Sequence, residues 1–429
     1  MHDPAAERLL PLLGRLENFE RSRPDRRVWD LATTRALLRM PEPAPLTVQV
    51  GGSKGKGTTC AFAAALGARL GRRTGCYLSP HAVTLLERFL VGGRPIEVDA
   101  LEAPLRAVLQ RASALRVQPT FFEALTVAAV DVFAAAGVDL AIYEVGLGGR
   151  FDATTAIPAQ VSIVTGIELE HTQVLGDTAA AIAAEKAPVI RPGGTGFTAA
   201  RGEALAVLEQ HARDCGARLC VLGTDLHLVD AAWHGGDYTA RLVLPGGREL
   251  PVRLPDARGF EPQALALAAA ALAELLPDAT LDLDPAPRPV SLPCRFEVRT
   301  APDGAPLVLD GAHTEHSLAA VAAELRRRWP DRPVSVLFAC AADKRWRPGL
   351  SALLAIADSF VVTGLSGTAG EEPRVIADWL EAQGARCAVA GDAAAALDLL
   401  CARPGPRLVC GSFYLAGAVS ALLRERTGA

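Results

Sequence analysis

LTVQVGGSKGKGTT, at residues 46–59, carries the most structural information in this chain of 429 residues. Leu46 to Val50 is a short apolar run of the β type, and a glycine-rich segment follows it directly. An alanine-rich helical pattern then continues to about Leu70. Because strand, glycine-rich loop and helix in this order are the context that a phosphate-binding loop requires, the segment predicts such a loop.

A loop of this kind binds phosphate oxygens with backbone N–H groups at a helix N-terminus, where the helix dipole adds to the attraction. Lys56 would reach the β- and γ-phosphates, and a hydroxyl at Thr58 or Thr59 would lie near a magnesium ion or a phosphate. The segment departs from the G-x-x-x-x-G-K-[ST] pattern, since Val50 replaces the first glycine and Gly57 separates Lys56 from Thr58. A glycine-rich turn without a ligand is the alternative. The candidate nucleotide-binding residues are Gly52, Ser53, Lys54, Gly55, Lys56, Gly57, Thr58 and Thr59.

Strand and helix patterns alternate downstream of this loop. Residues 123–136 and 178–189 have helical patterns, whereas 139–145 and 161–167 have the pattern of buried strands. This alternation predicts an α/β fold with a mostly parallel sheet, of the P-loop NTPase type. Short strands joined by glycine-rich turns are expected at 226–229, 238–243 and 249–254, as a small β excursion from that domain.

The proline-rich stretch Pro277 to Pro293 has the composition of a linker, and the alternation restarts after it. We therefore predict an ATP-binding domain at 1–285 and a Rossmann-like α/β domain at 286–429. Residues 1–40 have a helical pattern with a polar break at 21–27. Strands of the second domain are expected at 307–309, 334–339, 360–364, 388–390 and 407–410.

The cysteine pattern and the N-terminal sequence are those expected of a cytoplasmic protein. The net charge is −4 and no basic stripe dominates, so nothing favours nucleic acid or an anionic membrane as a partner. The first residues lack the pattern of a signal peptide, and no uncharged apolar run reaches the ~20 residues of a membrane span. Nine scattered cysteines without a CxxC pair are expected to be free thiols in a reducing compartment. We expect a monomer.

Several further motifs, in one order along nearly the whole chain, resemble those of the folylpolyglutamate synthase/dihydrofolate synthase family in the Mur ligase superfamily. Gly52 to Thr59 is similar to the family's G-T-N-G-K-G-[ST] loop. The other similar segments are Tyr77 to His81 with Glu87-Arg88, Thr120 to Glu123, Glu144 to Thr154, His171-Thr172 with Leu175-Gly176, Glu185 to Ala187, Arg295-Phe296, Asp310 to His313, Asp343-Lys344 and Gly411 to Leu415.

The resemblance implies a ligase that uses ATP and Mg²⁺. A folate or pteroate carboxylate would take the γ-phosphate of ATP, and the amino group of L-glutamate would then displace the phosphate. Because two anions must approach each other, magnesium and cationic groups are needed.

The resemblance also implies a metal site. Ser79, Glu144 and His171 match positions that hold magnesium, and Lys186 matches a lysine that helps to hold a second ion when it is carbamylated. Lys56, Lys186, His171 and Glu144 are accordingly the candidate catalytic residues. The residues also allow other interpretations: a turn residue for Ser79, a structural strand-end carboxylate for Glu144, a surface histidine for His171 and an exposed helix lysine for Lys186.

Other matched positions concern ATP and the substrates. Arg295 and Asp310 match ATP contacts from the second domain, with a salt bridge as the alternative. His316 and Ser412 match positions for glutamate, with a helix-start polar residue and a strand-end turn as alternatives. Thr120, Phe122, Glu123, Phe151, Asp152 and Ala153 match the folate or pteroate side, although Phe122 and Phe151 could equally be core residues.

Departures from the family pattern leave the acceptor open. The family's T-N in the loop is Ser53-Lys54 here, and the aspartate before H-T is Glu170. Thr314 replaces the family's asparagine after D-G-A-H. On the adenine side, the family's N-A-A segment is only loosely matched by Gln263-Ala264-Leu265. The family's N-terminal G-L-E-R segment is only vaguely matched by Glu20 to Arg23. Two alternatives follow: a Mur-type ligase for another carboxylate, and a non-catalytic nucleotide-binding relative. No G-x-G-x-x-G motif supports a dinucleotide oxidoreductase.

Overall fold

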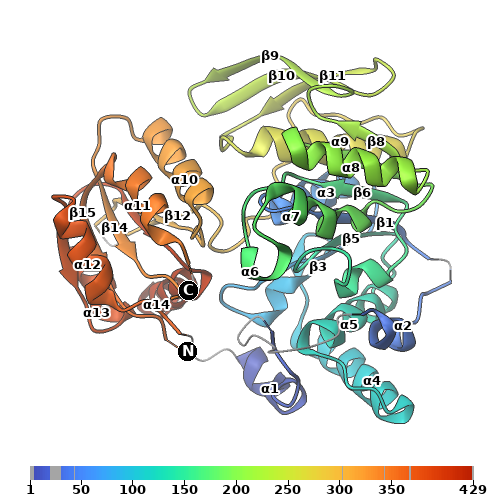
Figure 1. Cartoon of the computed structure of the whole chain (residues 1–429), viewed down its shortest axis with the longest axis horizontal. Coiled ribbons are helices and arrows are strands. Elements are labelled where there is room, and N and C mark those ends of the chain that lie inside the picture. Colours follow the sequence, from blue (N-terminus) through green and yellow to red (C-terminus); the bar gives the residue numbers. More distant parts are fainter. Residues whose placement is uncertain are drawn as a thin grey trace. The chain divides into compact units, whose positions relative to one another are not determined.

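The structure is a computed structural model that describes residues 4–19, 30–42, 44–301, 303–342, 344–366 and 369–427. The chain forms two compact units (Figure 1). The larger comprises residues 4–80 and 86–290, and the smaller comprises residues 81–85 and 291–429. Each unit has its own sheet.

The larger unit is built on a sheet in the order β4-β3-β2-β5-β1-β6-β7-β8. The six strands β2, β5, β1, β6, β7 and β8 run parallel, and β3 and β4 add an antiparallel edge beside β2. Buried apolar residues fill the central strands because both faces of a parallel sheet are covered. The bounds are β1 Leu46–Gly51, β2 Thr74–Tyr77, β3 Phe89–Val91, β4 Arg94–Pro95, β5 Leu140–Glu144, β6 Val161–Val164, β7 Thr195–Thr198 and β8 Arg218–Val221.

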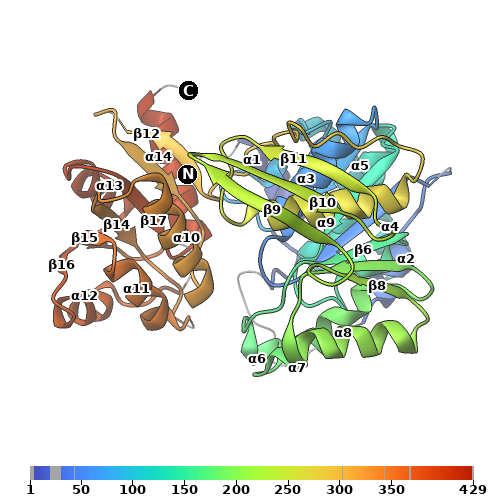
Figure 2. The same ribbon diagram turned by 90° about the horizontal axis from the view of Figure 1, so that it is seen from above.

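Helices cover both faces of this sheet, and Figure 2 shows α3 and α9 on the side opposite α7 and α8. Packing on the sheet is close: a Cβ at Gly67 of α3 would lie 2.4 Å from Leu140, and one at Gly75 of β2 would lie 2.8 Å from Phe133 of α5. The helices are α1 Pro4–Leu13, α2 Ala32–Leu37, α3 Lys56–Arg69, α4 Val98–Leu115, α5 Phe121–Ala135, α6 Thr172–Leu175, α7 Ala179–Lys186, α8 Gly202–Asp214 and α9 Glu261–Leu275.

The expected β excursion is an antiparallel sheet in the order β11-β10-β9. Its strands are β9 His227–His234, β10 Asp237–Val243 and β11 Glu249–Leu254, so the first is longer than the sequence predicted. Trp233 and Tyr238 meet across β9 and β10 with ring centroids 5.1 Å apart. Such aromatic pairs stabilise neighbouring strands of a sheet.

The smaller unit has a sheet in the order β12-β13-β17-β14-β15-β16, parallel except for β12. Its strands are β12 Glu297–Thr300, β13 Pro306–Leu309, β14 Val334–Phe338, β15 Ala357–Val362, β16 Arg386–Val389 and β17 Arg407–Cys410. Leu309, Leu337 and Val409 pack with α13 and α14 in one buried cluster. The helices are α10 Glu315–Arg328, α11 Trp346–Leu354, α12 Pro373–Ala382, α13 Ala393–Cys401 and α14 Phe413–Thr427.

Residues 81–85 belong to the smaller unit although the chain on either side of them belongs to the larger one. Ala82 packs against the core of the smaller unit, and a Cβ at Gly417 of α14 would lie 2.0 Å from the Ala82 carbonyl oxygen. A glycine is therefore required there for the segment to approach the helix. The sequence pattern gave no indication of this excursion.

The α/β fold class is confirmed, and the differences from the expected elements are local. The helix expected at 178–189 is α7 followed by a 3₁₀ turn, Ala187–Val189, because Pro188 has no N–H to continue the α-helix. The polar break at 21–27 lies outside the described residues. None of the helices in the described parts of the chain is long and apolar enough to cross a membrane.

Candidate active site

The glycine-rich loop connects the end of β1 to the start of α3. Its residues Gly52 and Gly55 have φ angles of +125° and +79°, which favour glycine. A Cβ at Gly52 would also lie 2.1 Å from Thr165 Oγ1 and 2.8 Å from Thr165 N. The loop can therefore adopt this path only with glycine at position 52.

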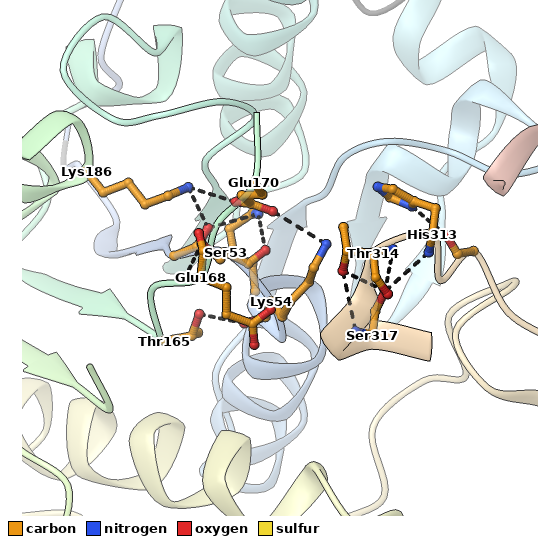
Figure 3. A network of polar contacts seen from close by, with 12 residues as sticks. Ser53, Lys54, Thr165, Glu168, Glu170, Lys186, His313, Thr314 and Ser317 are labelled. Carbon is orange, nitrogen blue, oxygen red and sulfur yellow. Dashed lines mark hydrogen bonds and ion pairs between the residues drawn. The ribbon is translucent and has the colours of Figure 1, made fainter. Parts of the chain in front are cut away.

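Residues that follow β6 hold the loop in place (Figure 3). Ser53 N donates to the Gly166 carbonyl at 2.7 Å, and Thr165 Oγ1 donates to the Lys54 carbonyl at 2.6 Å. Ser53 Oγ accepts from Glu168 N at 3.0 Å. The sequence analysis missed Thr165 and Glu168, because it extended the buried strand to residue 167 and their hydrogen bonds carry no periodic signal.

Three lysines converge on this loop. Lys56 Nζ donates to the Gly52 carbonyl at 3.1 Å and to the Ser53 carbonyl at 3.4 Å. Lys186 Nζ donates to the same Gly52 carbonyl at 3.0 Å and to Glu170 Oε1 at 3.1 Å. Lys54 Nζ lies 3.4 Å from Glu170 Oε2. Since the Lys186 side chain is only 2% exposed, it is not the exposed helix lysine of the alternative interpretation.

The electrostatics of this cluster favour an anionic ligand. Burial lowers the pKa of Lys186 to about 8, although the Glu170 carboxylate opposes the shift. Burial alone would raise the pKa of Glu170, but Lys186, Lys56 and Lys54 together hold it well below its usual range. Glu168 also lies near Lys54, so three ammonium groups face two carboxylates, which leaves a local excess of positive charge at the helix N-terminus.

The two threonines after the loop have different environments. Thr59 is fully buried, and its Oγ1 donates its only hydrogen to the Gly55 carbonyl at 2.9 Å. Thr58 is only partly buried. Of the two hydroxyls, Thr58 is therefore the one that a ligand can reach.

The candidate metal ligands lie at strand ends. Ser79 follows β2, and Glu144 ends the neighbouring parallel strand β5, so that Ser79 N donates to Glu144 Oε2 at 2.9 Å. Both residues are buried, and their oxygen atoms suit a hard cation such as Mg²⁺. His171 is exposed at the start of α6 with a left-handed φ of +48°. Within the described ranges, no group of three or more His, Cys, Asp and Glu side chains forms a ready metal site.

The Thr120 to Glu123 segment forms a capping box at the start of α5. Thr120 Oγ1 accepts from Glu123 N at 3.2 Å, and Glu123 Oε2 accepts from Thr120 N at 2.7 Å. Glu123 Oε1 also accepts from Thr34 Oγ1 at 3.4 Å. Both residues therefore have a structural role, which the T-x-x-E spacing before an apolar run could have predicted.

The aromatic candidates have unequal exposure. Phe122 packs over the backbone of Gly146, where a Cβ would lie 2.7 Å from Phe122 Cζ, and its ring centroid is 5.9 Å from that of Tyr77. Phe151 is 45% exposed and is not a core residue. Ala153 is buried.

Asp152 organises the loop that carries it. Its Oδ2 accepts from Gly146 N and Leu147 N, each at 3.0 Å. Its Oδ1 accepts from Thr154 N at 3.0 Å and from Thr154 Oγ1 at 2.6 Å. Burial raises the pKa of this carboxyl group, and the hydrogen bonds oppose the shift. Both oxygens are therefore already engaged by this loop.

Two ATP-side candidates lie in the smaller unit. Arg295 stacks over Phe413, with its guanidinium carbon 5.0 Å from the ring centroid. Asp310 follows β13 and accepts from Phe296 N and Ala312 N, each at 2.6 Å. Asp310 thus fixes the turn at the carboxyl end of a parallel strand, where ligands commonly bind in open α/β sheets.

The glutamate-side candidates lie near two helix starts of the same unit. His316 is exposed in the first turn of α10, and Thr314 caps that helix by accepting from Ser317 N at 3.4 Å. Ser412 Oγ accepts from Tyr414 N at 3.1 Å, which is the turn geometry of the alternative interpretation. Asp343 lies outside the described residues.

Comparison with known proteins shows which family this chain is similar to. Residues 294–413 match the family model described as "Mur ligase, glutamate ligase domain". A probable bifunctional folylpolyglutamate synthase/dihydropteroate synthase of Haloferax volcanii is 34% identical over 380 residues, which are 86% of this chain and 45% of that protein. This chain thus spans less than half the length of that relative. The dihydrofolate synthase/folylpolyglutamate synthase of Bacillus subtilis is 30% identical over 338 residues, covering 75% of this chain and 77% of the relative.

Solved structures match over nearly the whole chain. The Mycobacterium tuberculosis folylpolyglutamate synthase complexed with ADP and AMPPCP has a TM-score of 0.85 and 26% identity, and 98% of each chain is covered. A bifunctional folylpolyglutamate synthase/dihydrofolate synthase with Mn, AMPPNP and L-glutamate bound has a TM-score of 0.81 and 25% identity, with 97% of this chain and 98% of that chain covered.

Proposed function

Because this chain belongs to the folylpolyglutamate synthase/dihydrofolate synthase family, as its motifs suggested, we propose that it joins a folate or pteroate carboxylate to L-glutamate with ATP and Mg²⁺. The observation that carries the proposal is the glycine-rich loop with lysines 54, 56 and 186 around it. The ligands named for similar structures, a nucleotide, a divalent metal and L-glutamate, support the same chemistry.

The proposed reaction has two steps. A carboxylate oxygen of the acceptor attacks the γ-phosphorus of ATP, the bond to ADP breaks, and an acyl phosphate forms. The amine nitrogen of glutamate then attacks the acyl carbon, phosphate leaves with the C–O bonding electrons, and the nitrogen loses a proton. The free energy of ATP hydrolysis thereby drives amide formation.

We assign the phosphate side to the loop and its lysines. The loop N–H groups and Lys56 would bind the phosphates, and the Thr58 hydroxyl would face the metal or a phosphate. Lys56 and Lys186 both donate to the Gly52 carbonyl, and because an ammonium group has three N–H donors, each could contact a phosphate oxygen without leaving that carbonyl. A fixed positive environment lowers the barrier because negative charges converge in the transition state.

Ser79, Glu144 and His171 are the proposed magnesium ligands, together with Lys186 if it is carbamylated. When bound, Mg²⁺ would neutralise phosphate charge. Ser79 and Glu144 fit this role through their oxygen atoms and their adjacency at the ends of β2 and β5. Native mass spectrometry of the intact protein in bicarbonate buffer would detect the added mass of a carbamate, and loss of that mass in Lys186→Arg would locate it at Lys186.

The pterin side of the acceptor site is proposed to be lined by Phe122, Phe151 and Ala153. The exposed ring of Phe151 offers a surface on which a pterin could stack. Asp152, Thr120 and Glu123 would then act by shaping the pocket, since their own oxygens are engaged by backbone donors. Arg295 and Asp310 are proposed to bind ATP, and His316 and Ser412 to bind glutamate.

We further propose that the protein acts as a monomer in the cytoplasm and does not bind nucleic acid. The net charge of −4 supports the absence of nucleic acid, and nine cysteines that form no disulfide fit a reducing compartment. Light scattering after size-exclusion chromatography would test the monomer, because a dimer would double the mass.

The decisive experiment measures phosphate release from MgATP and L-glutamate with dihydropteroate, then with tetrahydrofolate, and identifies products by mass. Glutamate addition to either acceptor supports the proposal, and addition to both makes the enzyme bifunctional. Binding of ATP without turnover on either acceptor would refute the folate assignment. Turnover on another acid would then favour the second candidate, a Mur-type ligase, for which the replacement of asparagine by Thr314 is the motivating observation.

A further inference from the structure

A continuous chain of hydrogen bonds inside the larger unit ends at Asp152. It begins at Arg191, whose Nη2 donates to Gln49 Oε1 at 2.6 Å. Gln49 Nε2 then donates to Thr154 Oγ1 at 2.9 Å and to Thr155 Oγ1 at 3.0 Å. Thr154 Oγ1 in turn donates to Asp152 Oδ1 at 2.6 Å. Two residues that the proposed function does not use, Gln49 and Arg191, are thus linked to the acceptor side of the site.

The members of this network come from three separate segments of the chain. Gln49 lies within β1 and is 1% exposed, although β1 is a buried strand. Thr154 and Thr155 are buried in the 3₁₀ turn Ala153–Ala156. Arg191 is half-buried just after the 3₁₀ turn Ala187–Val189. Because a buried amide is costly unless its hydrogen bonds are made, the Gln49 side chain depends on this network.

Arg191 fixes the direction of every hydrogen bond in the network. A guanidinium has donors and no acceptor, so the Gln49 atom that faces it must be the amide oxygen. The amide nitrogen of Gln49 then faces both threonine hydroxyls, which accept from it and pass their own hydrogens on. Thr154 donates to Asp152, and Thr155 donates to the Gly149 carbonyl at 2.7 Å. The network therefore has a single arrangement of hydrogens, in which the Asp152 carboxylate accepts.

The charge of Arg191 has no carboxylate partner among the described residues. Its Nη2 also donates to the Ile157 carbonyl at 3.1 Å, so neutral oxygens receive its hydrogen bonds. Burial lowers the pKa of Arg191 to about 10, and Arg35 adds to this shift, yet the group stays charged at neutral pH. Since partial burial of an uncompensated charge costs stability, stability alone does not account for an arginine here. The orientation that it imposes on Gln49 does.

The network acts on the loop that carries Phe151. Asp152 Oδ2 accepts from Gly146 N and Leu147 N, so the carboxylate joins the two ends of this loop. Gln49 belongs to β1, the strand that ends in the phosphate loop. The hydrogen bonds through Gln49 therefore fix the acceptor-side loop against the strand that leads to the nucleotide phosphates.

We propose that Gln49 and Arg191 are positioning residues of the acceptor site, which hold the 146–155 loop in the conformation that binds the folate or pteroate. This inference rests on the proposed ligase function and deepens its acceptor side. Without Arg191, the Gln49 amide is free to turn over, and its oxygen then takes the Thr154 hydrogen away from Asp152. The loop loses a hydrogen bond that fixes it, and the acceptor binds less well. MgATP binding depends on other groups and is retained.

The kinetic test measures KM for MgATP and KM for the acceptor that the unmodified chain uses, dihydropteroate or tetrahydrofolate. We expect Arg191→Met to raise KM for the acceptor about tenfold, as loss of one buried hydrogen bond implies, and KM for MgATP by less than about twofold. Arg191→Lys keeps a side chain that only donates and should recover part of this loss. Because the network passes through Gln49, Arg191→Met should add nothing to the effect of Gln49→Leu in the double variant.

Hydrogen exchange followed by mass spectrometry gives a readout that does not depend on activity. The amides of Gly146, Leu147 and Thr154 donate to Asp152, so peptides that contain them should exchange faster in Arg191→Met than in the unmodified chain. Peptides from α10 of the smaller unit should exchange at the same rate in both proteins. A difference confined to the loop separates positioning from a general loss of stability.

Thr195→Val is the matched control, because it removes a hydroxyl of β7 in the same unit that donates to Glu274 Oε1 at 3.0 Å. It should leave both KM values and the exchange of the loop unchanged. Equal rises of both KM values in Arg191→Met, or unchanged exchange of its 146–155 loop, would overturn the inference. If the unmodified chain used neither acceptor, the proposed function itself would fail, while hydrogen exchange would still test the network. The two failures are therefore distinguishable.

Discussion

Replacing Gly52 with alanine tests the phosphate loop most directly. A Cβ at this position would lie 2.1 Å from Thr165 Oγ1 and 2.8 Å from Thr165 N, whereas ordinary contact begins at 3.4 Å. The hydroxyl could rotate away, but the backbone nitrogen is fixed because it donates to the Gly51 carbonyl at 3.0 Å. The loop must therefore move by the order of 1 Å relative to β6.

This displacement sets the expected magnitude. Alanine at a φ of +125° lies outside the left-handed region open to L-residues and adds about 1–2 kcal/mol of backbone strain. A misplacement of about 1 Å in positioning groups costs about 100-fold in rate. We therefore expect Gly52→Ala to lose about 100-fold in kcat/KM for ATP, and a comparable share of MgATP affinity.

Gly71→Ala is the matched control. Gly71 has a φ of +78° just after α3, and nothing lies within 4 Å of a Cβ built there. It should lose about 1 kcal/mol of unfolding free energy from strain alone and keep its affinity for MgATP. The assays are ATP-dependent phosphate release, calorimetry with MgATP and urea unfolding. Near-normal MgATP affinity in Gly52→Ala would refute the assignment of this loop to phosphate.

Three further predictions concern single side chains. Lys56→Ala should cost at least ~2 kcal/mol in the transition state, seen as a roughly 30-fold loss of kcat/KM in phosphate release, and near-normal turnover would contradict its role. Asp152→Asn should lower the free energy of unfolding in urea by about 2–4 kcal/mol, because two of the four donors that face the carboxylate would lose their acceptor. A decrease below about 0.5 kcal/mol would show that the loop does not depend on the Asp152 carboxylate. Since the pKa of Glu170 is lowered in the folded state, its contribution to stability is fully present above its ordinary pKa of about 4.5 and is lost as the pH falls below that value. Urea unfolding at pH 7 and at pH 4 should thus show a smaller acid loss for Glu170→Gln than for the unmodified chain, and equal acid losses would contradict this account.

The sequence predicted the fold class and the principal strands because their signals are local. The apolar run at 46–50 and the glycines after it identify β1 and the phosphate loop without tertiary information. Six strands were not predicted, since each has at most four residues and leaves only a short local pattern: β2, β3, β4, β7, β8 and β12. The path of residues 81–85 into the smaller unit depends on a close approach to Gly417, which no periodicity records.

In the candidate site, the sequence identified which residues matter but did not reveal what each side chain does. Thr120, Glu123 and Asp152 were expected to bind substrate, yet their oxygens accept backbone hydrogen bonds that shape a helix start and a loop. A residue can be characteristic of a binding site because it fixes the backbone around the ligand, and sequence cannot separate that role from direct contact. The T-x-x-E spacing was the exception, because a capping box has its own sequence signature.

Lys186 illustrates what burial adds to a sequence reading. In the sequence it is one lysine in a helical pattern, for which exposure is the usual state. In the structure its ammonium lies beside Gly52 of the phosphate loop and Glu170, with 2% of the side chain exposed. Burying a charge is unfavourable unless a partner compensates it, and here Glu170 is that partner. Because Glu170 also faces Lys54, any change at Lys54 must alter the environment of Lys186, which is why the two lysines have to be tested together through Glu170.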